Sequence, residues 1–410
     1  MKKPILALVP SAYNTSKVYT PIPINGDGDF TFSRSTTATR MNKDGLIEEV
    51  AINTPRLDYL KGKNCPSLLL EGASTNLLTD SSDFTAWNDI LVAVDSNVII
   101  APDGTIEADK VTRTSTSANY ISDFFNKSAS ALTYTSSIFV KRGNTDELAL
   151  RSQGSYPARI DIRYNFETNS IYYVNPLSGF LFVSSNVENY PNGWVRLSWT
   201  YTTDAHTLLT GISLSPRLTS GNTDSNDTST TAFCYVWGGQ CEESNISTSY
   251  IPTVGSSVTR NLESCVDGGS LSLFDISEGT FFIDIVPNNS NQTYYISLNS
   301  GASDNRVLFV WSGSTLSFRV VQNGLSVTYD NSAVYGERQR LAISWNSSET
   351  KSYLNGVLVS TQSLTGYPVG LSKVDYAIYT GTVNFFEGCT YGLKVYNEVL
   401  TEAEAIELTK

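Results

Sequence analysis

The sequence has little charge for its length. Asp, Glu, Lys and Arg make up 17% of the 410 residues, against about 25% in a typical globular domain. The 28 basic and 40 acidic residues leave a formal net charge of −12. Nucleic-acid binding needs a basic patch that neutralises phosphates, so this acidic balance argues against a nucleic-acid partner.

Long apolar runs are also missing. A membrane-spanning helix needs about 18 or more consecutive apolar residues, and no stretch of this chain approaches that length, so we expect no membrane insertion. The start, MKKPILALVPSAY, has basic residues before an apolar run, but Pro4 and Pro10 interrupt it. We therefore do not expect a signal peptide there.

Cysteine is scarce and irregularly spaced. The five residues are Cys65, Cys234, Cys241, Cys265 and Cys389. An odd number at wide spacing does not fit a disulfide framework, and without a C-x-x-C pair a structural zinc site is not expected. The sequence favours reduced thiols in a protein made in a cytosol.

The chain has one histidine, and its acidic residues are not grouped for catalysis. His206 would have to serve any Ser-His-Asp, Cys-His or His-metal arrangement, but it stands at a turn with no Ser or Cys elbow nearby. Glycoside hydrolysis needs two facing carboxylates. Asp284 has no acidic residue two positions away, and Glu48 and Glu49 fall on opposite strand faces. We expect no catalytic residue, and so no enzyme.

The sequence is instead rich in aromatic residues and in strand-like alternation. It contains 23 Tyr and 6 Trp, which favour strands and binding faces. In GWVRLSWTYTT (193–203) apolar residues alternate with the rest, which indicates a strand with one buried face. Many short runs of this kind, separated by turns, predict an all-β fold built from jelly-roll sandwiches. We expect Trp199 and Trp345 in the cores.

Composition and turns divide the chain into three expected regions. Residues 1–75 form an irregular N-terminal attachment or oligomerisation segment with a β-hairpin around NKDG, where Gly45 takes a positive φ. Residues 76–260 form one jelly roll and residues 261–410 a second. In the latter, Asn323-Gly324 and Asn355-Gly356 each predict a type I′ hairpin.

The last region ends with a helix signal. Thr401 and Glu404 have capping-box spacing, so each side chain can satisfy a free backbone N–H at a helix start. A helix of about eight residues is not stable alone. We therefore expect Ala405 and Leu408 to dock on the sandwich.

Two sets of phrases resemble known families. RLAISWNSSETKSYLNGVLVST and GCTYGLKVYNEVLTEAEAIELT resemble the laminin-G-like, concanavalin-A-type jelly roll. SLLLEGASTNLLTDSSDFTAWN, YTSSIFVKRG, NGWVRLSWTY and GGQCEESNISTSYIPTVGSSVTR resemble a carbohydrate-binding-module jelly roll of phage fibres. Together with FTFSRSTTATRMNKDGLIEEV, they are similar to head-fibre and tail-fibre proteins of tailed bacteriophages. Relatives carry an apolar residue where this chain has Cys241, which fits a small buried hydrophobe.

The resemblance implies a structural virion protein, a head or tail fibre or spike subunit that displays glycan-binding domains for attachment to the host surface. It implies other virion proteins as partners, a homo-oligomer such as a trimer, and location in the virion after assembly in the host cytoplasm. A docking, decoration or adaptor protein without glycan binding is the main alternative. A polysaccharide depolymerase is less favoured, and a bacterial surface adhesin is a weaker rival.

Sugar binding points to exposed aromatic rings, which stack on the apolar face of a pyranose. Tyrosines flanked by turn residues are the candidates, although a ring that plugs a loop against a sandwich edge is the simpler interpretation of each: Tyr156, Tyr190, Tyr335 and Tyr367. In RSTTATR, Arg34 and Arg40 are candidates for assembly or attachment, with a solvated edge strand blunted by charge as the alternative.

No cofactor is expected, although calcium stays open. Asp27 and Asp29 in NGDGDF, and Asp267 in ESCVDGG, offer carboxylates, and laminin-G-type domains often hold calcium at a rim. The further acids and distal Glu of an EF-hand loop are absent, so polar turns are the simpler interpretation.

Overall fold

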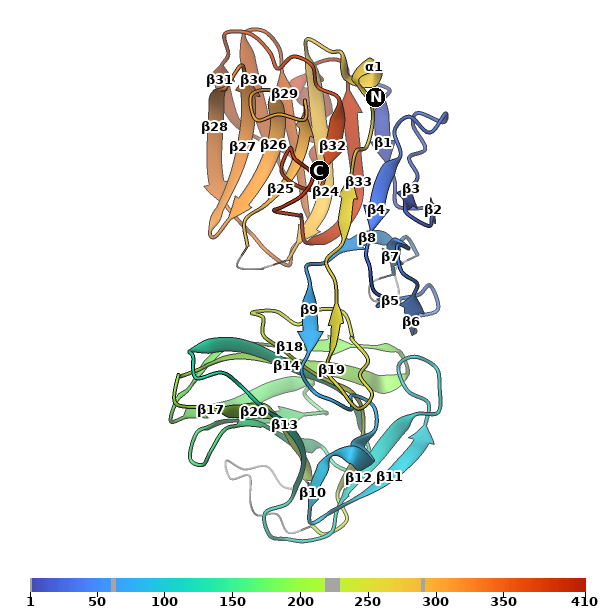
Figure 1. The fold of residues 1–410 in the computed structure, drawn as a ribbon, viewed down its shortest axis with the longest axis vertical. Coiled ribbons are helices and arrows are strands. Elements are labelled where there is room, and N and C mark those ends of the chain that lie inside the picture. Colours follow the sequence, from blue (N-terminus) through green and yellow to red (C-terminus); the bar gives the residue numbers. More distant parts are fainter. Residues whose placement is uncertain (1, 60–63, 218–228, 289–291) are drawn as a thin grey trace. The chain divides into compact units, whose positions relative to one another are not determined.

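The computed structural model describes residues 2–59, 64–217, 229–288 and 292–410. Their regular secondary structure is almost entirely β-strand, with a few short helices (Figure 1). The predicted all-β fold is confirmed.

The chain divides into two compact units. Unit 1 consists of residues 1–37, 50–73 and 261–410, and unit 2 of residues 38–49 and 74–260. The chain therefore passes from one unit to the other four times. Residues 1–75, for which we expected a segment of its own, contribute strands to both units.

Unit 1 is a sandwich of two antiparallel sheets. The eight-stranded sheet has, in order, β31 (Val357–Ser363), β30 (Glu349–Leu354), β29 (Gln339–Trp345), β24 (Gly279–Pro287), β33 (Gly388–Tyr396), β8 (Ser67–Leu70) and β7 (Arg56–Asp58), with β1 (Leu6–Leu8) also paired to β33. The five-stranded sheet has β28 (Leu325–Ser332), β27 (Thr315–Gln322), β26 (Arg306–Ser312), β25 (Tyr294–Asn299) and β32 (Lys373–Asp375). A small sheet of β2 (Tyr13–Asn14), β3 (Lys17–Val18), β4 (Phe30–Ser33) and β23 (Ser264–Val266) completes the unit.

Alternation along these strands builds the core of unit 1. Phe281 and Ile283 of β24 point inward, and Phe309 of β26 and Phe318 of β27 meet them from the other sheet. Successive side chains of a strand point to opposite faces, so every second residue reaches the core. Trp345 is fully buried there, as predicted.

Both predicted Asn-Gly hairpins are present. Asn323 and Gly324 have φ values of 46° and 81° and join β27 to β28, and Asn355 and Gly356 have 47° and 80° and join β30 to β31. A type I′ turn requires positive φ at both central positions, which Asn and Gly tolerate best.

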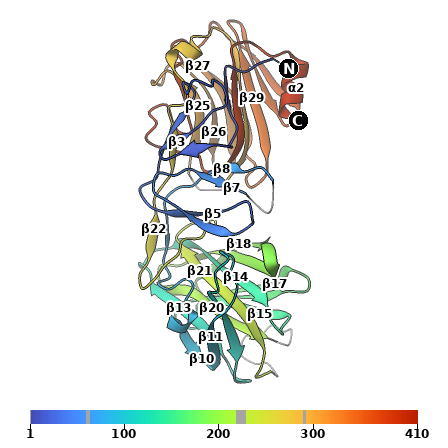
Figure 2. The same ribbon diagram turned by 90° about the vertical axis from the view of Figure 1, so that its right-hand side faces the viewer.

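The terminal helix α2 (Glu402–Thr409) begins with the predicted capping box: Thr401 accepts from the Glu404 N–H, and the Glu404 carboxylate accepts from the Thr401 N–H. Ala405 and Leu408 are buried against Tyr353 of β30 and neighbouring residues, so the predicted docking is confirmed. Figure 2 shows α2 beside β29. The other α-helix of the described chain is α1 (Leu271–Phe274), and no helix in those ranges is long and apolar enough to cross a membrane.

Unit 2 is a second antiparallel sandwich. One six-stranded sheet has β10 (Asn88–Ile90), β13 (Tyr120–Asn126), β20 (Leu209–Arg217), β15 (Glu147–Gln153), β16 (Arg159–Asn165) and β17 (Ser170–Leu177). The other has β11 (Val92–Ile99), β12 (Ala108–Arg113), β21 (Phe233–Glu242), β14 (Leu132–Arg142), β19 (Trp194–Thr203) and β18 (Phe180–Asn189). Leu197 and Trp199 of β19 pack in the core with Leu150 and Ile212 of the first sheet, as alternation predicted for Trp199.

Shorter elements complete unit 2. The pair β9 (Ser74–Asn76) and β22 (Val258–Arg260) and the hairpin β5 (Ala38–Met41) and β6 (Ile47–Val50) are two-stranded. Gly45 in the β5–β6 turn has a φ of 78°, which confirms the predicted turn. The 3-10 turns are η2 (Phe84–Ala86) and η3 (Pro191–Gly193).

Candidate functional site

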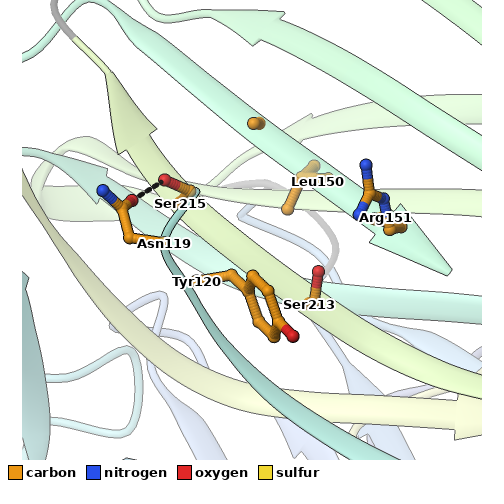
Figure 3. Close-up of a pocket in the computed structure, with 7 residues that line it drawn as sticks. Asn119, Tyr120, Leu150, Arg151, Ser213 and Ser215 are labelled. Atoms are coloured by element: carbon orange, nitrogen blue, oxygen red, sulfur yellow. Dashed lines mark hydrogen bonds between the residues drawn. The ribbon is translucent and has the colours of Figure 1, made fainter. Parts of the chain in front are cut away.

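A partly open pocket lies on the non-core side of the first sheet of unit 2. Its lining comes from three neighbouring strands, β13, β20 and β15, and from the residue before β13 (Figure 3). The lining residues are Asn119, Tyr120, Ala149, Leu150, Arg151, Ser213 and Ser215.

Strand alternation explains why polar groups collect here. In β20 the apolar residues Ile212 and Leu214 enter the core, so Ser213 and Ser215 face the other way. In β15, Leu150 belongs to the core and Arg151 to the opposite face. The sheet therefore presents hydroxyl, amide and guanidinium groups on its outer side.

Hydrogen bonds fix one side of the pocket. Ser215 Oγ donates to Asn119 Oδ1 over 2.7 Å (Figure 3). Arg113 Nη1 donates to Ser215 Oγ over 3.1 Å. The Asn119 amide also donates to the carbonyls of Ser115 and Ser117. These partners fix the orientation of the Asn119 side chain in the absence of a ligand.

The other side leads to a row of charges on β15 and β16. Arg151 Nε donates to Asp161 Oδ1 over 2.6 Å, and Arg159 Nε donates to Asp161 Oδ2 over 2.9 Å. The Arg159 guanidinium also lies 5.3 Å from the centre of the Tyr156 ring, which is 78% exposed. Contacts thus run without a break from the pocket to Tyr156, one of the tyrosines that the sequence singled out.

Two further arginines lie on this face. Arg163 of β16 and Arg217 of β20 are both buried. Burial, with the like charge of Arg217, lowers the pKa of Arg163 to about 10. With this pKa Arg163 stays protonated at neutral pH, and the carboxylates of Asp161 and Glu147 oppose the effect of burial.

The pocket can recognise a polar ligand. It combines a tyrosine ring with amide, hydroxyl and guanidinium groups, which is what a sugar needs for stacking and for sorting its hydroxyls. Its lining includes no carboxylate, thiol or imidazole, and Asp161 beside it is held between two arginines. The arrangement suits binding rather than proton transfer.

The other candidate tyrosines lie apart from this pocket. In unit 2, Tyr190 packs its ring edge-on against Phe139, with the ring centres 4.9 Å apart. In unit 1, the hydroxyl of the half-buried Tyr335 donates to the Gly313 carbonyl. Tyr190 and Tyr335 therefore close loops against their sandwiches. Tyr367, between β31 and β32, is 37% exposed.

Arg34 is part of a buried charge network in unit 1. Its Nη1 lies 2.6 Å from Glu263 Oε1, and both side chains are fully buried. Arg56 pairs with the same Glu263 and, over 2.8 Å, with Glu71. This corrects the interpretation of Arg34 as part of a solvated edge, because its guanidinium is enclosed inside its own unit. A role of Arg34 in assembly stays a prediction.

Arg40 is more accessible. Its Nε lies 2.7 Å from Glu48 Oε1, across the β5–β6 hairpin of unit 2. The Asn42 amide donates to the other oxygen of Glu48. Arg40 thus stabilises the hairpin, and its role in assembly stays a prediction.

The remaining titratable candidates are engaged locally. His206 is exposed, and its backbone N–H donates to Asp204. Asp284 is held by Arg338 at 2.7 Å and by Arg340 at 3.1 Å. These contacts describe a turn and an ion pair, and they bring no nucleophile or second acid to either residue.

The calcium candidates also have local partners. Asp29 accepts from the Thr20 N–H, Asp27 accepts from the Asn25 amide, and Asp267 pairs with Lys373 at 2.9 Å. Within the ranges that the structure describes, no three His, Cys, Asp or Glu side chains gather closely enough to hold a metal ion.

None of the five cysteines is in a disulfide. Cys234, Cys241, Cys265 and Cys389 are buried, and Cys65 is exposed. Cys241 lies in the core of unit 2, which confirms it as a small buried hydrophobe. Burial raises the pKa of its thiol to about 12, so it is not a nucleophile at neutral pH.

Sequence reasoning missed the pocket residues. Tyr120, Arg151 and Ser213 come from three strands that are distant in sequence, and turns rather than strands supplied the candidates. The alternation in ELALRSQ and in LTGISLSP places Arg151 and Ser213 on non-core faces. Pairing of β13, β20 and β15 brings the three residues together, and no single stretch of the sequence predicts that pairing.

Comparison with known families agrees with the fold of unit 1. The laminin-G-type model of the concanavalin A-like lectin/glucanases superfamily matches residues 273–405. The match runs from α1 into α2 and confirms the concanavalin-A-type jelly roll predicted for this region. No curated protein matches the sequence.

Solved structures show weaker likenesses. The carbohydrate-binding module CBM40 of the Ruminococcus gnavus IT-sialidase, bound to α2,3-sialyllactose, is 20% identical over 35% of this chain and 88% of that one, with a TM-score of 0.31. Domain 4 of a GH43 arabinanase from Geobacillus stearothermophilus is 16% identical over 36% and 73%, with a TM-score of 0.30. Domains LG4-5 of mouse laminin α1 are 9% identical over 70% and 92%, with a TM-score of 0.25. Likenesses of this degree do not indicate what this chain binds, and the family match describes its C-terminal third.

Proposed function

We propose that this chain is a structural virion protein of a tailed bacteriophage, a fibre or spike subunit that binds glycans on the host surface. The pocket of unit 2 is the glycan site of this proposal. The observation that carries it is the set of fixed polar side chains beside Tyr120 on an outer sheet face. The concanavalin-A-like match of unit 1 supports the same class of ligand. The phage assignment rests on the resemblance of the sequence phrases.

A glycan array on the whole chain tests the binding step. We expect a restricted set of glycans to be retained, and Tyr120→Ala and Arg151→Gln to weaken binding about tenfold, or about 1.4 kcal/mol. Arg151→Gln is a usable variant because Asp161 keeps its pairing with Arg159 at 2.9 Å.

Matched variants separate loss of contact from loss of fold. Tyr19→Ala removes a half-buried tyrosine from unit 1 and should leave array binding unchanged. If no glycan is retained even by chains clustered on beads, the proposal of glycan binding is wrong, and the virion docking or decoration role replaces it. Release of new reducing ends from host polysaccharide would instead show a depolymerase.

The location and assembly need their own test. Antibody labelling of phage particles in electron micrographs should place this chain on a fibre or spike, and light scattering of the purified chain should show a homo-oligomer such as a trimer. Particles without label would contradict the virion assignment whatever the array shows.

A further inference from the structure

Two arginines lie close together on the outer face of the five-stranded sheet of unit 1. Arg306 of β26 pairs with Val321 of β27, and Arg319 of β27 pairs with Leu308 of β26. The two arginines are therefore diagonal neighbours on one face, because residues two apart in a strand share a side. Val307 and Phe309, which alternate with Arg306 and Leu308 along β26, point to the other side and enter the core.

No carboxylate balances this pair directly. Across the described ranges, neither Arg306 nor Arg319 forms an ion pair with an acidic side chain, and the Nε atoms of both are buried without a hydrogen-bond partner. Among the described residues, Arg319 donates to the Ser317 hydroxyl, which in turn donates to Asp330 over 2.6 Å. Two half-buried guanidinium groups that are adjacent and not paired directly with a carboxylate are costly.

The electrostatics of Arg306 agree with this geometry. Burial lowers the pKa of Arg306 and the nearby charge of Arg319 lowers it further, whereas the hydroxyls of Tyr379 and Tyr295 and the carboxylate of Asp304 act in the opposite direction. An anion at this place would relieve both the burial cost and the repulsion between the guanidinium groups.

Aromatic and apolar groups surround the two charges. The Arg306 guanidinium lies 5.0 Å from the centre of the Tyr379 ring. Leu308, Val310 and Val321 form a small buried apolar cluster on the same face, with Tyr295 packed against it. The partly buried rings of Tyr295 and Tyr379 beside two guanidinium groups fit a ligand with one carboxylate and one apolar face.

We propose that the outer face of β26 and β27 is a second, separate binding site, at which Arg306 and Arg319 hold the carboxylate of an acidic sugar and Tyr379 and Tyr295 contact its ring. The proposal goes beyond the unit 2 pocket and rests on the proposed function only in taking the ligand to be a saccharide. Guanidinium pairs favour carboxylates through parallel N–H···O bonds, which a neutral sugar cannot accept in the same way.

Paired probes that differ in one charge test it. We take trigalacturonic acid and the methyl glycoside of N-acetylneuraminic acid, each beside its carboxyl methyl ester, and measure binding to the whole chain by calorimetry. We expect at least one acid to bind about tenfold or more tightly than its ester. Arg306→Gln and Arg319→Gln should each remove most of that preference while leaving ester binding unchanged.

Three further variants make the outcome decisive. Lys410→Gln removes one positive charge from an exposed side chain of the same unit and should leave the preference intact. Arg319→Lys keeps the charge but loses the paired donors and should lose part of the preference. Tyr120→Ala, in the unit 2 pocket, should not change it, which separates this proposal from the previous one. Equal binding of acid and ester, or a preference that survives in both Arg→Gln variants, would overturn it.

Discussion

At the scale of single residues, we expect the largest effect on stability from a change at Glu263. Its carboxylate is fully buried between Arg34 and Arg56. Breaking a buried ion pair from one side leaves uncompensated charge inside, which costs about 3–5 kcal/mol. We expect Glu263→Gln to lose stability of that order, measured by urea unfolding with a probe in unit 1.

A matched carboxylate in the same unit provides the control. Glu398 pairs with Lys2 at 2.7 Å, and both side chains are about one-third exposed. Glu398→Gln should shift the urea midpoint far less, because solvent screens an exposed pair. Equal shifts for the two variants would show that burial of the Glu263 network contributes nothing special.

Cys241 allows a prediction about pH. Its pKa is raised from the usual 9.0 to about 12 by burial. Above pH 9 the unfolded chain loses this proton while the folded chain keeps it, so stability falls as pH rises, by about 1.4 kcal/mol per pH unit for one thiol. Cys241→Ala should therefore show a shallower fall in unfolding free energy between pH 9 and 11 than the parent chain. Parallel curves would contradict the assignment, whatever the starting stability of the variant.

Residue identities alone could not have given the role of Arg34. Its partner Glu263 is 229 positions away, and a local pattern carries no information about such a contact. Tyr156 shows the opposite case. Its neighbours in sequence indicated an exposed ring, and the structure places it 78% exposed beside Arg159.

At the scale of elements, helix α2 offers the sharpest test. Its start depends on Thr401, which accepts a hydrogen bond from the Glu404 N–H. Replacing an N-cap Thr with Ala costs about 1 kcal/mol. We expect Thr401→Ala to speed amide exchange throughout α2 and Thr401→Ser to leave it near the parent rate. An unchanged rate in Thr401→Ala would mean that docking of Ala405 and Leu408 alone fixes the helix.

Local elements were the predictable part of the fold. The hairpins at Asn323-Gly324 and Asn355-Gly356 and the cap of α2 follow from a few adjacent residues, since each depends on backbone conformation or a near hydrogen bond. The strand β1 did not follow in this way. Leu6 pairs with Val395 of β33, and only the closed sheet defines that partner.

At the scale of the whole molecule, the order in which the chain connects its strands limits what could be predicted from composition. Residues 1–75 looked irregular because their strands complete sheets whose other strands come much later, as when Leu70 of β8 pairs with Gly388 of β33. The same applies to the candidate site, whose three strands are adjacent only in the sheet order β13-β20-β15. The total charge of −12 could be predicted, but not which charged side chains the strand pairing brings together on one sheet face.

If the chain works on a multivalent particle, its affinity should depend on copy number. A second binding event on the same surface becomes intramolecular, which often raises avidity by about a hundredfold or more without any new contact. We expect chains displayed as tetramers on streptavidin to bind host cells at least about a hundredfold more tightly than single chains, while affinity for a soluble oligosaccharide stays the same. Tetramers of Tyr120→Ala combined with Arg306→Gln are the control, since both proposed sites are altered. If those tetramers bind cells as tightly as the parent tetramers, neither proposed sugar site is needed for attachment. The two outer sheet faces would then have to serve as docking surfaces instead.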